Sequence, residues 1–467
     1  MSQRNRSRVW LATLLLILGS VAWPSCVSAQ RAELEKIIKR KVLPNGLEVI
    51  VVENHGVPLA TIEVNVKNGS FTQTPEYAGL AHMYEHMFFR ANSKYSEPES
   101  FVSRAGDLGA VFNGTTGEER VNYYLTVPAD SLGAGIRFLS SALTAPLFRQ
   151  DELERERQVV IGEYDRNESS PFFRLNQEMD RLLYPGNFSR KNVIGDRQVI
   201  LTTTPEKMRT IQRRYYVPNN AVLIVSGDVD PRQVFLLAER ELGGWKRGEN
   251  PFVADPIPQI PALTKNQGVI VEADVGAVTV FLQWQGPSVG KDAKSTYAAD
   301  VFSDVLNDPG SKFQQRLVDS GLWQSMGVNY YTLNNVGPIT ISGQTSPENL
   351  RKALVALEGE IAKFNDPAYF DPEELEAAKA HRAVTSAFDR ERASGFAHTL
   401  GFWWSVADLE YYMGYVDNMA KQTTADLRAY AGRYIVGKPR ITGVLISPTA
   451  KQQLSLTTGE LAHEGTE

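Results

Sequence analysis

Alternating apolar and polar residues mark one strand-rich stretch in each half of the chain. The first stretch reads KVLPNGLEVIVVENH and then TIEVNVKNGS, with Asn45-Gly46 as a turn signal between two strands. The second begins at Gly268, reads GVIVEADVGAVTVFLQWQG and alternates in the same way. Elsewhere apolar residues recur at helical spacing, which predicts helices over residues 75–90, 151–167 and 373–386.

The two halves also end alike, which indicates an internal duplication. Residues 204–217 read TPEKMRTIQRRYYV and residues 423–436 read TTADLRAYAGRYIV, so an offset of 219 superposes them. Each stretch runs toward a strand, AVLIVSGDV in the first half and ITGVLIS in the second. Two unrelated amphipathic helices are the alternative, but the matching order of elements favours a duplicated α+β unit.

The predicted fold is therefore α+β, with two related domains that each contain a mainly antiparallel sheet with helices. We place the first domain at residues 30–250 and the second at 265–456, sizes that are usual for domains. Pro256, Pro258 and Pro261 disfavour regular structure and suggest a linker over residues 251–264. Residues 457–467 are expected to form a tail.

Residues 1–29 have the three-part layout of a secretory signal. Three arginines precede the mostly apolar run from Val9 to Trp23, and Val27-Ser28-Ala29 offers a cleavage site before Gln30. A membrane anchor is the alternative, but this run is short for a span of about 20 residues. We expect an exported protein, periplasmic or secreted, that is not attached to a membrane after cleavage.

Composition narrows the chemistry further. The only cysteine, Cys26, lies within the expected signal, so the mature chain would have neither disulfides nor thiolate metal ligands. The formal net charge of −5 gives no sign of nucleic-acid binding, which favours a basic face.

The most specific signal is His82-Met83-Tyr84-Glu85-His86. Histidines at positions i and i+4 share one face of a helix, so both imidazoles can reach one metal ion. Glu85 lies beside a ligand and can act as general base toward an attacking water. Zinc is the expected metal because it accepts imidazole and carboxylate ligands without thiolates. A surface His/Glu cluster is the alternative, but with so few histidines a chance match is on the order of one in a few hundred.

A catalytic zinc usually has a third protein ligand, and the predicted helix DELERERQVVIGEYDRN offers two candidates. Glu156 and Glu163 are seven residues apart and share a face, so either could bind the metal on the residues alone. We assign the other glutamates of this helix, Glu152 and Glu154, to a solvated face.

HMYEHMFF followed by ERQVVIGEY resembles the pitrilysin/insulinase peptidases, which include the mitochondrial processing peptidases. In that family the third ligand is a glutamate 77 positions after the second histidine, which implies Glu163 here. Glu156 matches a family carboxylate seven residues earlier, which supports the ligands from outside.

A second stretch, NGTT through VNYY, resembles the family's substrate-binding edge strand, which takes extended peptides by main-chain hydrogen bonds. The resemblance implies substrate contacts for Asn113 and Tyr123, although Gly114 replaces the usual alanine. A turn asparagine and a core aromatic are the alternatives for these two residues.

The second half departs from the family pattern. Members that work alone carry an Arg and a Tyr in a segment of the type LREKRGLAY. The corresponding LVDSGLWQ is one residue shorter and has Val318 and Gln324 at these positions. Arg316, Tyr330 and Tyr331 are nearby but out of register. The resemblance therefore implies a heterodimer with a similar subunit that lacks HxxEH and supplies the Arg/Tyr pair. A homodimer that uses the out-of-register residues is the alternative.

Together these features predict a zinc-dependent endopeptidase that cleaves extended peptides or unfolded segments, with Glu85 as general base. The rival hypothesis is a non-catalytic partner subunit or peptide-binding module that keeps the fold. The complete HMYEH motif with Glu163 argues against this rival.

Overall fold

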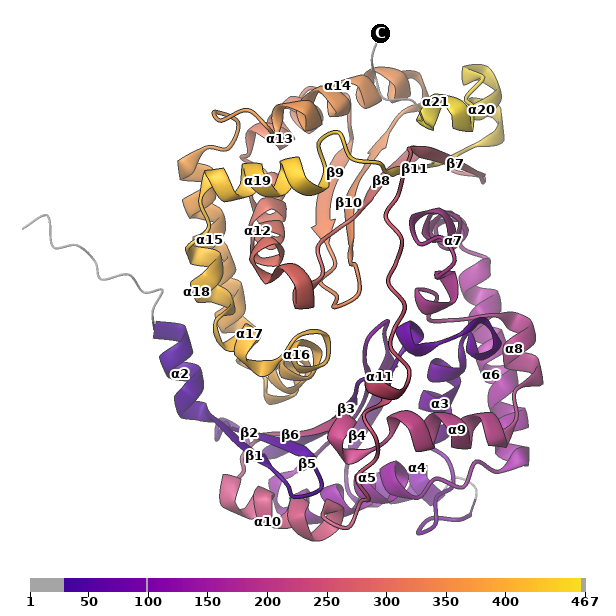
Figure 1. Ribbon diagram of the computed structural model, residues 1–467, viewed down its shortest axis with the longest axis vertical. Coiled ribbons are helices and arrows are strands. Elements are labelled where there is room, and N and C mark those ends of the chain that lie inside the picture. The colour runs from indigo at the N-terminus through magenta and orange to yellow at the C-terminus, as the bar shows by residue number, and fades with distance from the viewer. Residues whose placement is uncertain (1–28, 98–99, 463–467) are drawn as a thin grey trace, which may run out of the picture.

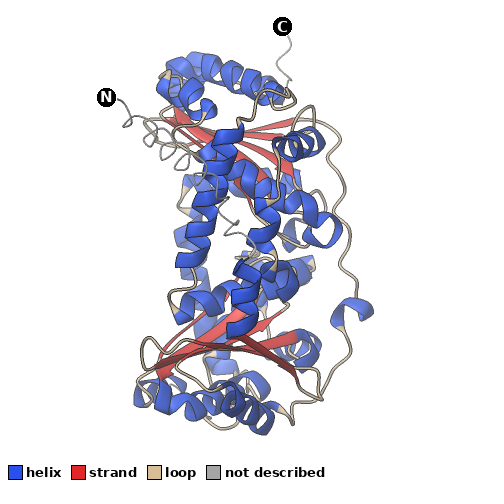
Figure 2. Ribbon diagram, turned by 90° about the vertical axis from the view of Figure 1, so that its left-hand side faces the viewer, coloured by secondary structure: helices blue, strands red, loops and turns tan. Residues whose placement is uncertain are grey.

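A computed structural model describes residues 29–97 and 100–462 of the chain. The expected leader, apart from its last residue, lies outside the described residues, as does Cys26. Figure 1 shows two layered halves stacked along the long axis, and Figure 2 shows their sheets at opposite ends of the molecule. The predicted α+β class with two sheets is thereby confirmed. Within the described part of the chain, no helix is long and apolar enough to cross a membrane.

The first sheet has six strands in the order β1-β2-β6-β3-β5-β4. Neighbouring strands are antiparallel except β2 and β6, which are parallel. The predicted Asn45-Gly46 turn joins β1 to β2, and Gly46 takes the positive φ of 93° that favours glycine. The strands are β1 (Ile38–Val42), β2 (Glu48–Glu53), β3 (Leu59–Val66), β4 (Val111–Thr116), β5 (Val121–Pro128) and β6 (Ala221–Gly227).

The second sheet has five strands in the order β7-β11-β8-β10-β9, with one parallel pair, β7 and β11. Its strands are β7 (Gln267–Glu272), β8 (Val278–Gln285), β9 (Ser325–Tyr330), β10 (Pro338–Thr345) and β11 (Ile441–Ile446). The offset of 219 also superposes the bounds of β3 on those of β8. The two sheets are therefore related, as the sequence repeat predicted.

Helices surround both sheets. Those before the connection between the halves are α2 (Ala29–Ile37), α3 (Leu80–Phe88), α4 (Ser100–Asp107), α5 (Leu132–Thr144), α6 (Gln150–Glu168), α7 (Pro171–Leu183), α8 (Arg197–Thr202), α9 (Pro205–Tyr215), α10 (Pro231–Leu242) and α11 (Pro251–Ala254). Those after it are α12 (Val289–Asn307), α13 (Lys312–Gln314), α14 (Leu350–Lys363), α15 (Pro372–Phe388), α16 (Ala393–Val406), α17 (Leu409–Met413), α18 (Tyr415–Ala420), α19 (Thr424–Tyr434), α20 (Pro448–Leu454) and α21 (Thr458–Ala462). The connection itself, residues 255–266, contains no helix or strand (Figure 1).

Two predicted helices, α6 and α15, form within two residues of their expected bounds, but the prediction of one helix over residues 75–90 is wrong. The structure has a 3₁₀ turn over Pro75–Tyr77, and α3 begins only after Gly79. Gly79 is left-handed, with φ of 90°, and a Cβ there would meet the carbonyl oxygen of Ile194 at 2.7 Å. This close approach ends the first turn and sets where the helix bearing His82 starts.

The two halves exchange helices. Helix α7 belongs to the first half but packs against β7 and β11, and α16 belongs to the second half but packs against β3 and β6. The apolar stripe Leu175, Met179 and Leu183 of α7 shares a buried cluster with residues of β7 and β11. Figure 1 shows each helix lying against the sheet of the opposite half. Each half therefore supplies part of the other's core.

Two hairpin tips also join the halves. Buried Glu119, between β4 and β5, accepts hydrogen bonds from the N–H groups of Asn334 at 2.6 Å and Asn335 at 2.7 Å. Nearby, Lys191 donates to Glu118 at 2.7 Å and to the carbonyls of Asn335 and Val336, each at 2.9 Å. The loop between β9 and β10 is thereby fixed against the tip of the β4–β5 hairpin.

Helix α16 packs tightly against β3 at Gly401. A Cβ at this position would overlap the side-chain amide of Asn65, which is buried and donates to Glu63 at 3.0 Å. Fully buried Glu63 also pairs with His398 of α16, so this contact between the halves is polar as well as tight.

We expect Gly401→Ala to lower the free energy of unfolding by about 1–3 kcal/mol, because overpacking outweighs the gain in helix propensity. The control is Gly359→Ala in α14, where nothing lies within 4 Å of an added Cβ. That variant should gain about 0.5–1 kcal/mol. Denaturant titration of both variants provides the measurement, and equal responses would contradict the close packing of α16.

Candidate metal centre

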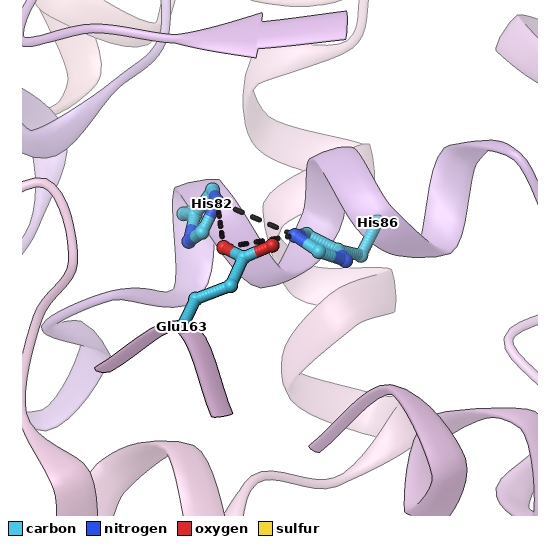
Figure 3. A group of neighbouring side chains, drawn as sticks. All are labelled: His82, His86 and Glu163. Carbon is cyan, nitrogen blue, oxygen red and sulfur yellow. Dashed lines mark hydrogen bonds and ion pairs between the residues drawn. The ribbon is translucent and has the colours of Figure 1, made fainter. Parts of the chain in front are cut away.

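Three side chains from two helices converge on one point. Helix α3 supplies His82 and His86, and α6 supplies Glu163 (Figure 3). The Oε2 atom of Glu163 lies 3.5 Å from Nε2 of His82 and 3.8 Å from Nε2 of His86. The two Nε2 atoms are 3.3 Å apart, and one ligand atom from each residue lies within 4.8 Å of the others. The predicted trio is thus brought together.

The surroundings of the two imidazoles favour a cation between them. Burial, with the charge of His86, lowers the pKa of His82 to about 4, so its ring is neutral at pH 7. Burial also lowers the pKa of His86, but the hydrogen bond with Glu156 and the charges of Glu85 and Glu163 outweigh it, and the net shift is upward. Two facing ring nitrogens and a carboxylate oxygen are a donor set that fits zinc.

The structure separates the two glutamates that the sequence left open. Glu156 is buried on the far side of His86, where its Oε2 atom lies 3.1 Å from Nδ1. Its other oxygen pairs with Arg90 at 2.5 Å. A hydrogen bond at Nδ1 fixes the tautomer that leaves the Nε2 lone pair free for a metal. Glu163 therefore lies between the two Nε2 atoms, where a metal ligand would lie, and Glu156 contacts His86 from the opposite side of its ring.

Glu85 points into the same cavity from α3. Its Oε2 atom accepts a hydrogen bond from Oγ1 of Thr116 at 2.8 Å. Burial raises the pKa of Glu85, and the hydrogen bond from Thr116 opposes this shift. A Cβ on Gly114 would meet Cγ of Glu85 at 2.9 Å, so the glycine lets β4 lie close to this carboxylate. The arrangement can hold a carboxylate ready for proton transfer.

A cavity of about 670 Å³ opens beside these residues. It is bordered by β4, the faces of α3 and α6 that carry the candidate ligands, one face of α7, and residues 188–194. Its lining consists of His82, Glu85, His86, Asn113, Gly114, Thr115, Thr116, Glu163, Asn167, Phe173, Asn176, Gln177, Asp180, Phe188, Lys191, Asn192, Val193 and Ile194.

The two predicted substrate-binding residues lie in different surroundings. Asn113 is exposed on β4, lines the cavity, and accepts a hydrogen bond from the N–H of Gly114 at 2.9 Å. Tyr123 is fully buried, stacks on Phe88 with ring centroids 3.6 Å apart, and hydrogen-bonds to Tyr216 at 2.6 Å. The structure does not bring Tyr123 to the cavity, because its ring lies in the core behind β5.

The edge strands of the two sheets differ. Strand β4 pairs with β5 on one side only, and its other edge has no neighbouring strand. Strand β9 has the equivalent place in the second sheet, but Asn307 of α12 hydrogen-bonds to its outer edge at Val328. The N–H of Val328 donates to Oδ1 of Asn307 at 2.8 Å, and Nδ2 donates back to the Val328 carbonyl at 2.7 Å. Among the described strands, β4 alone lines the cavity beside the candidate metal centre, and its outer edge has no neighbouring strand.

The second half has no comparable trio at the matching positions. The offset of 219 superposes the bounds of α3 on the last turns of α12 and puts Val301 and Val305 where the first half has histidines. Asp304 matches Glu85 and pairs with Arg382 of α15. Apolar packing and an ion pair thus take the place of a metal centre.

The out-of-register residues of the second half are mostly engaged elsewhere. Arg316 lies in a π-helical turn over Gln315–Asp319 and pairs with Glu360 at 3.1 Å. Tyr330 is buried and donates to the carbonyl of Pro287 at 2.9 Å. Tyr331 is 38% exposed, and its hydroxyl lies near Gly117 at the end of the edge strand.

Sequence reasoning missed the contacts of Thr116 and Arg90, and the part of α7 that lines the cavity. Arg90 stands four residues after His86, one helical turn on, a spacing that could have suggested a shared partner. The spacing of Asn176, Gln177 and Asp180 on α7 likewise marks one polar face. No pattern within one segment of the sequence indicates the contact of Thr116 with Glu85, because the two residues lie 31 positions apart.

Comparisons with known proteins agree with this geometry. Residues 48–186 match the family profile "Insulinase (Peptidase family M16)", and residues 202–381 match "Peptidase M16 inactive domain". The zinc protease PqqE of Helicobacter pylori is 25% identical over 405 residues, which cover 84% of this chain and 89% of the relative. A crystal structure of a protease from Helicobacter pylori matches with a TM-score of 0.78 at 23% identity, over 88% of this chain and 99% of that one. The first half of the periplasmic protease PqqL from Escherichia coli matches with a TM-score of 0.74 at 18% identity, over 92% and 98%.

We expect Glu163→Gln to lose bound zinc, because a neutral amide is a poor zinc ligand. Glu156→Gln should keep most of the metal and weaken zinc affinity or activity by about 10–100-fold, the usual effect of removing a hydrogen-bond partner of a ligand. Elemental analysis after dialysis against graded chelator distinguishes the two. Zinc loss that follows Glu156 instead would contradict the assignment.

Proposed function

This chain belongs to the insulinase (M16) family of peptidases, and we propose that it is a zinc-dependent endopeptidase. Its substrates would be extended peptides or unfolded segments. The observation that carries the proposal is the convergence of His82, His86 and Glu163 beside Glu85, in a cavity bordered by a free strand edge.

The proposed chemistry assigns a role to each residue of the centre. His82, His86 and Glu163 would hold zinc, which polarises the scissile carbonyl and lowers the pKa of water toward about 7. Glu85 accepts a proton from the attacking water and returns it to the leaving amine nitrogen. Thr116 orients Glu85 by its hydrogen bond, and Glu156 keeps the Nε2 lone pair of His86 directed at the centre.

Substrate binding is proposed along β4. An extended peptide would add a strand to the free edge, so its main chain supplies affinity without a particular sequence. Asn113 contributes a side-chain amide at the cavity wall. Tyr123 would act from behind, by fixing β5 through its contacts with Phe88 and Tyr216. Because the hairpin tips hold the halves together, folded proteins should enter poorly.

The rival function is that of a non-catalytic partner or peptide-binding module, which would not need a complete metal centre. Here the general base is oriented by Thr116, and a ligand is oriented by Glu156. These supporting contacts favour catalysis over peptide binding alone. Turnover of a peptide library by the zinc-loaded protein separates the two functions.

We propose a heterodimer with a similar subunit that lacks HxxEH and supplies an Arg/Tyr pair. Arg316 and Tyr330 form contacts within their own half, which weakens the alternative of a homodimer that uses them. Tyr331 alone lies near the edge strand. We also propose export to the periplasm or outside, from the leader-like residues 1–29 and from the periplasmic relative in Escherichia coli.

We expect Glu85→Gln to keep a full equivalent of zinc and to lose nearly all peptidase activity. The amide preserves the shape of the side chain but cannot accept the proton of water, a role typically worth 10²–10⁴-fold, so about that loss in kcat is expected. Metal stoichiometry and turnover are measured on the same sample. Near-normal activity would remove Glu85 from its role.

We expect the isolated, zinc-loaded chain to be a weak peptidase whose kcat rises when a paralogue with the Arg/Tyr segment is added. Such a pair would act on transition-state charge and orientation, so zinc content should not change. Assays with and without the paralogue provide the test. Full activity from the chain alone, unaffected by any partner, would rule out the heterodimer.

A further inference from the structure

Arg90 stands at the junction between the two helices that carry the candidate ligands. It follows the end of α3 by two positions, and its N–H donates to the carbonyl of Met87 at 3.2 Å. The next residue, Ala91, is tied to α6, because its N–H donates to both carboxylate oxygens of Glu152, at 3.2 and 3.3 Å. Glu152 is therefore buried, not solvated as its helix pattern predicted. Main-chain contacts on both sides thus fix where the Arg90 side chain begins.

The Arg90 side chain reaches a carboxylate that contacts His86 from behind. Nη2 of Arg90 lies 2.5 Å from Oε1 of Glu156, and Oε2 of the same carboxylate lies 3.1 Å from Nδ1 of His86. This Nδ1 atom points away from Glu163, whereas Nε2 of the same ring faces it (Figure 3). A continuous chain of contacts therefore runs from Arg90 through Glu156 to a candidate ligand.

Glu156 depends on Arg90 for its charge balance. Its side chain is only 4% exposed, and a buried carboxylate needs a cation or several hydrogen-bond donors beside it. A histidine that binds zinc through Nε2 is neutral, so His86 would offer Glu156 a hydrogen bond but no full charge. Arg90 supplies that charge, and the ion pair also restricts rotation of the carboxylate that faces His86.

We propose that Arg90 is a positioning residue for the candidate ligand His86. It holds the Glu156 carboxylate in one orientation, Glu156 holds the imidazole, and the two together raise the affinity of the centre for zinc. The inference rests on the proposed function, specifically on its zinc centre. Arg90 is not part of the cavity lining, so its effect on the centre passes through Glu156.

The test is a double-mutant cycle on zinc affinity, measured by chelator competition with the purified chain. Arg90→Met should weaken zinc binding by about 10-fold, the lower end of the usual effect of a group that supports a ligand from outside. Arg90→Lys should keep most of the affinity, because lysine preserves the charge. In the Glu156→Gln background, Arg90→Met should have no further effect, since a neutral amide needs no counter-charge.

Arg155→Met is the matched control, because Arg155 adjoins Glu156 along α6 but pairs with exposed Asp151 at 3.4 Å. It should leave zinc affinity unchanged. Urea titration of each metal-free variant checks that the compared samples are folded. The Arg90 side chain is 32% exposed, so its replacement leaves no closed cavity, and Arg90→Gln takes the place of Arg90→Met if that variant does not fold.

Wild-type affinity in Arg90→Met, or an equal loss with and without the Glu156 carboxylate, would overturn the inference. So would a loss of the same size in Arg155→Met. Affinity that depends on Arg90 only while Glu156 is present would support it, even if the protein cleaves no peptide and the proposed peptidase fails. A wild-type chain that binds no zinc would overturn both.

Discussion

The reciprocal burial of α7 and α16 is the contact on which the rest of the structure depends. Each sheet would expose an apolar inner face if the helix of the other half were absent. Helix α6, which carries Glu163, runs almost directly into α7, with only Ser169 and Ser170 between them. The third candidate ligand is therefore held between α3 on one side and the second sheet on the other. A centre built from the first half depends on the second half for its rigidity.

The duplication explains how one half can hold the candidate metal ligands while the matching positions of the other half pack in its core. Both halves repeat the same order of strands and helices, so a helix stands behind each edge strand. In the first half that helix presents imidazoles and a carboxylate to the cavity. In the second, Val301 and Val305 face a core, and Asp304 is neutralised by Arg382. The frame is shared, and the side chains at three or four positions decide whether it can hold a metal ion.

Sequence patterns predicted what depends on local spacing and missed what depends on distant contacts. Strands β1, β2, β3, β6, β7, β8 and β11 and the helix-face placement of His82 and His86 follow from local patterns, and the duplication follows from two similar segments. Strands β9 and β10 were not predicted. The choice between Glu156 and Glu163 needed the resemblance or the structure, because both share a face of α6. The burial of Tyr123, the interruption at Gly79 and the contact of Thr116 with Glu85 arise from chain segments that meet only in the folded state. A pattern within one segment holds no information about them.

The side-chain amide of Asn307 has a consequence for how copies of this protein behave toward one another. An amide that donates and accepts one hydrogen bond imitates a peptide group, so Val328 of β9 is paired as if a neighbouring strand were there. Exposed strand edges are templates for self-association, and a molecule with two of them could form open-ended chains. The unpaired edge of β4 faces a cavity, whereas β1 and β7 are the outer strands at the other ends of the two sheets. This difference between β4 and β9 would favour strand addition beside the candidate metal centre over pairing between copies at β9.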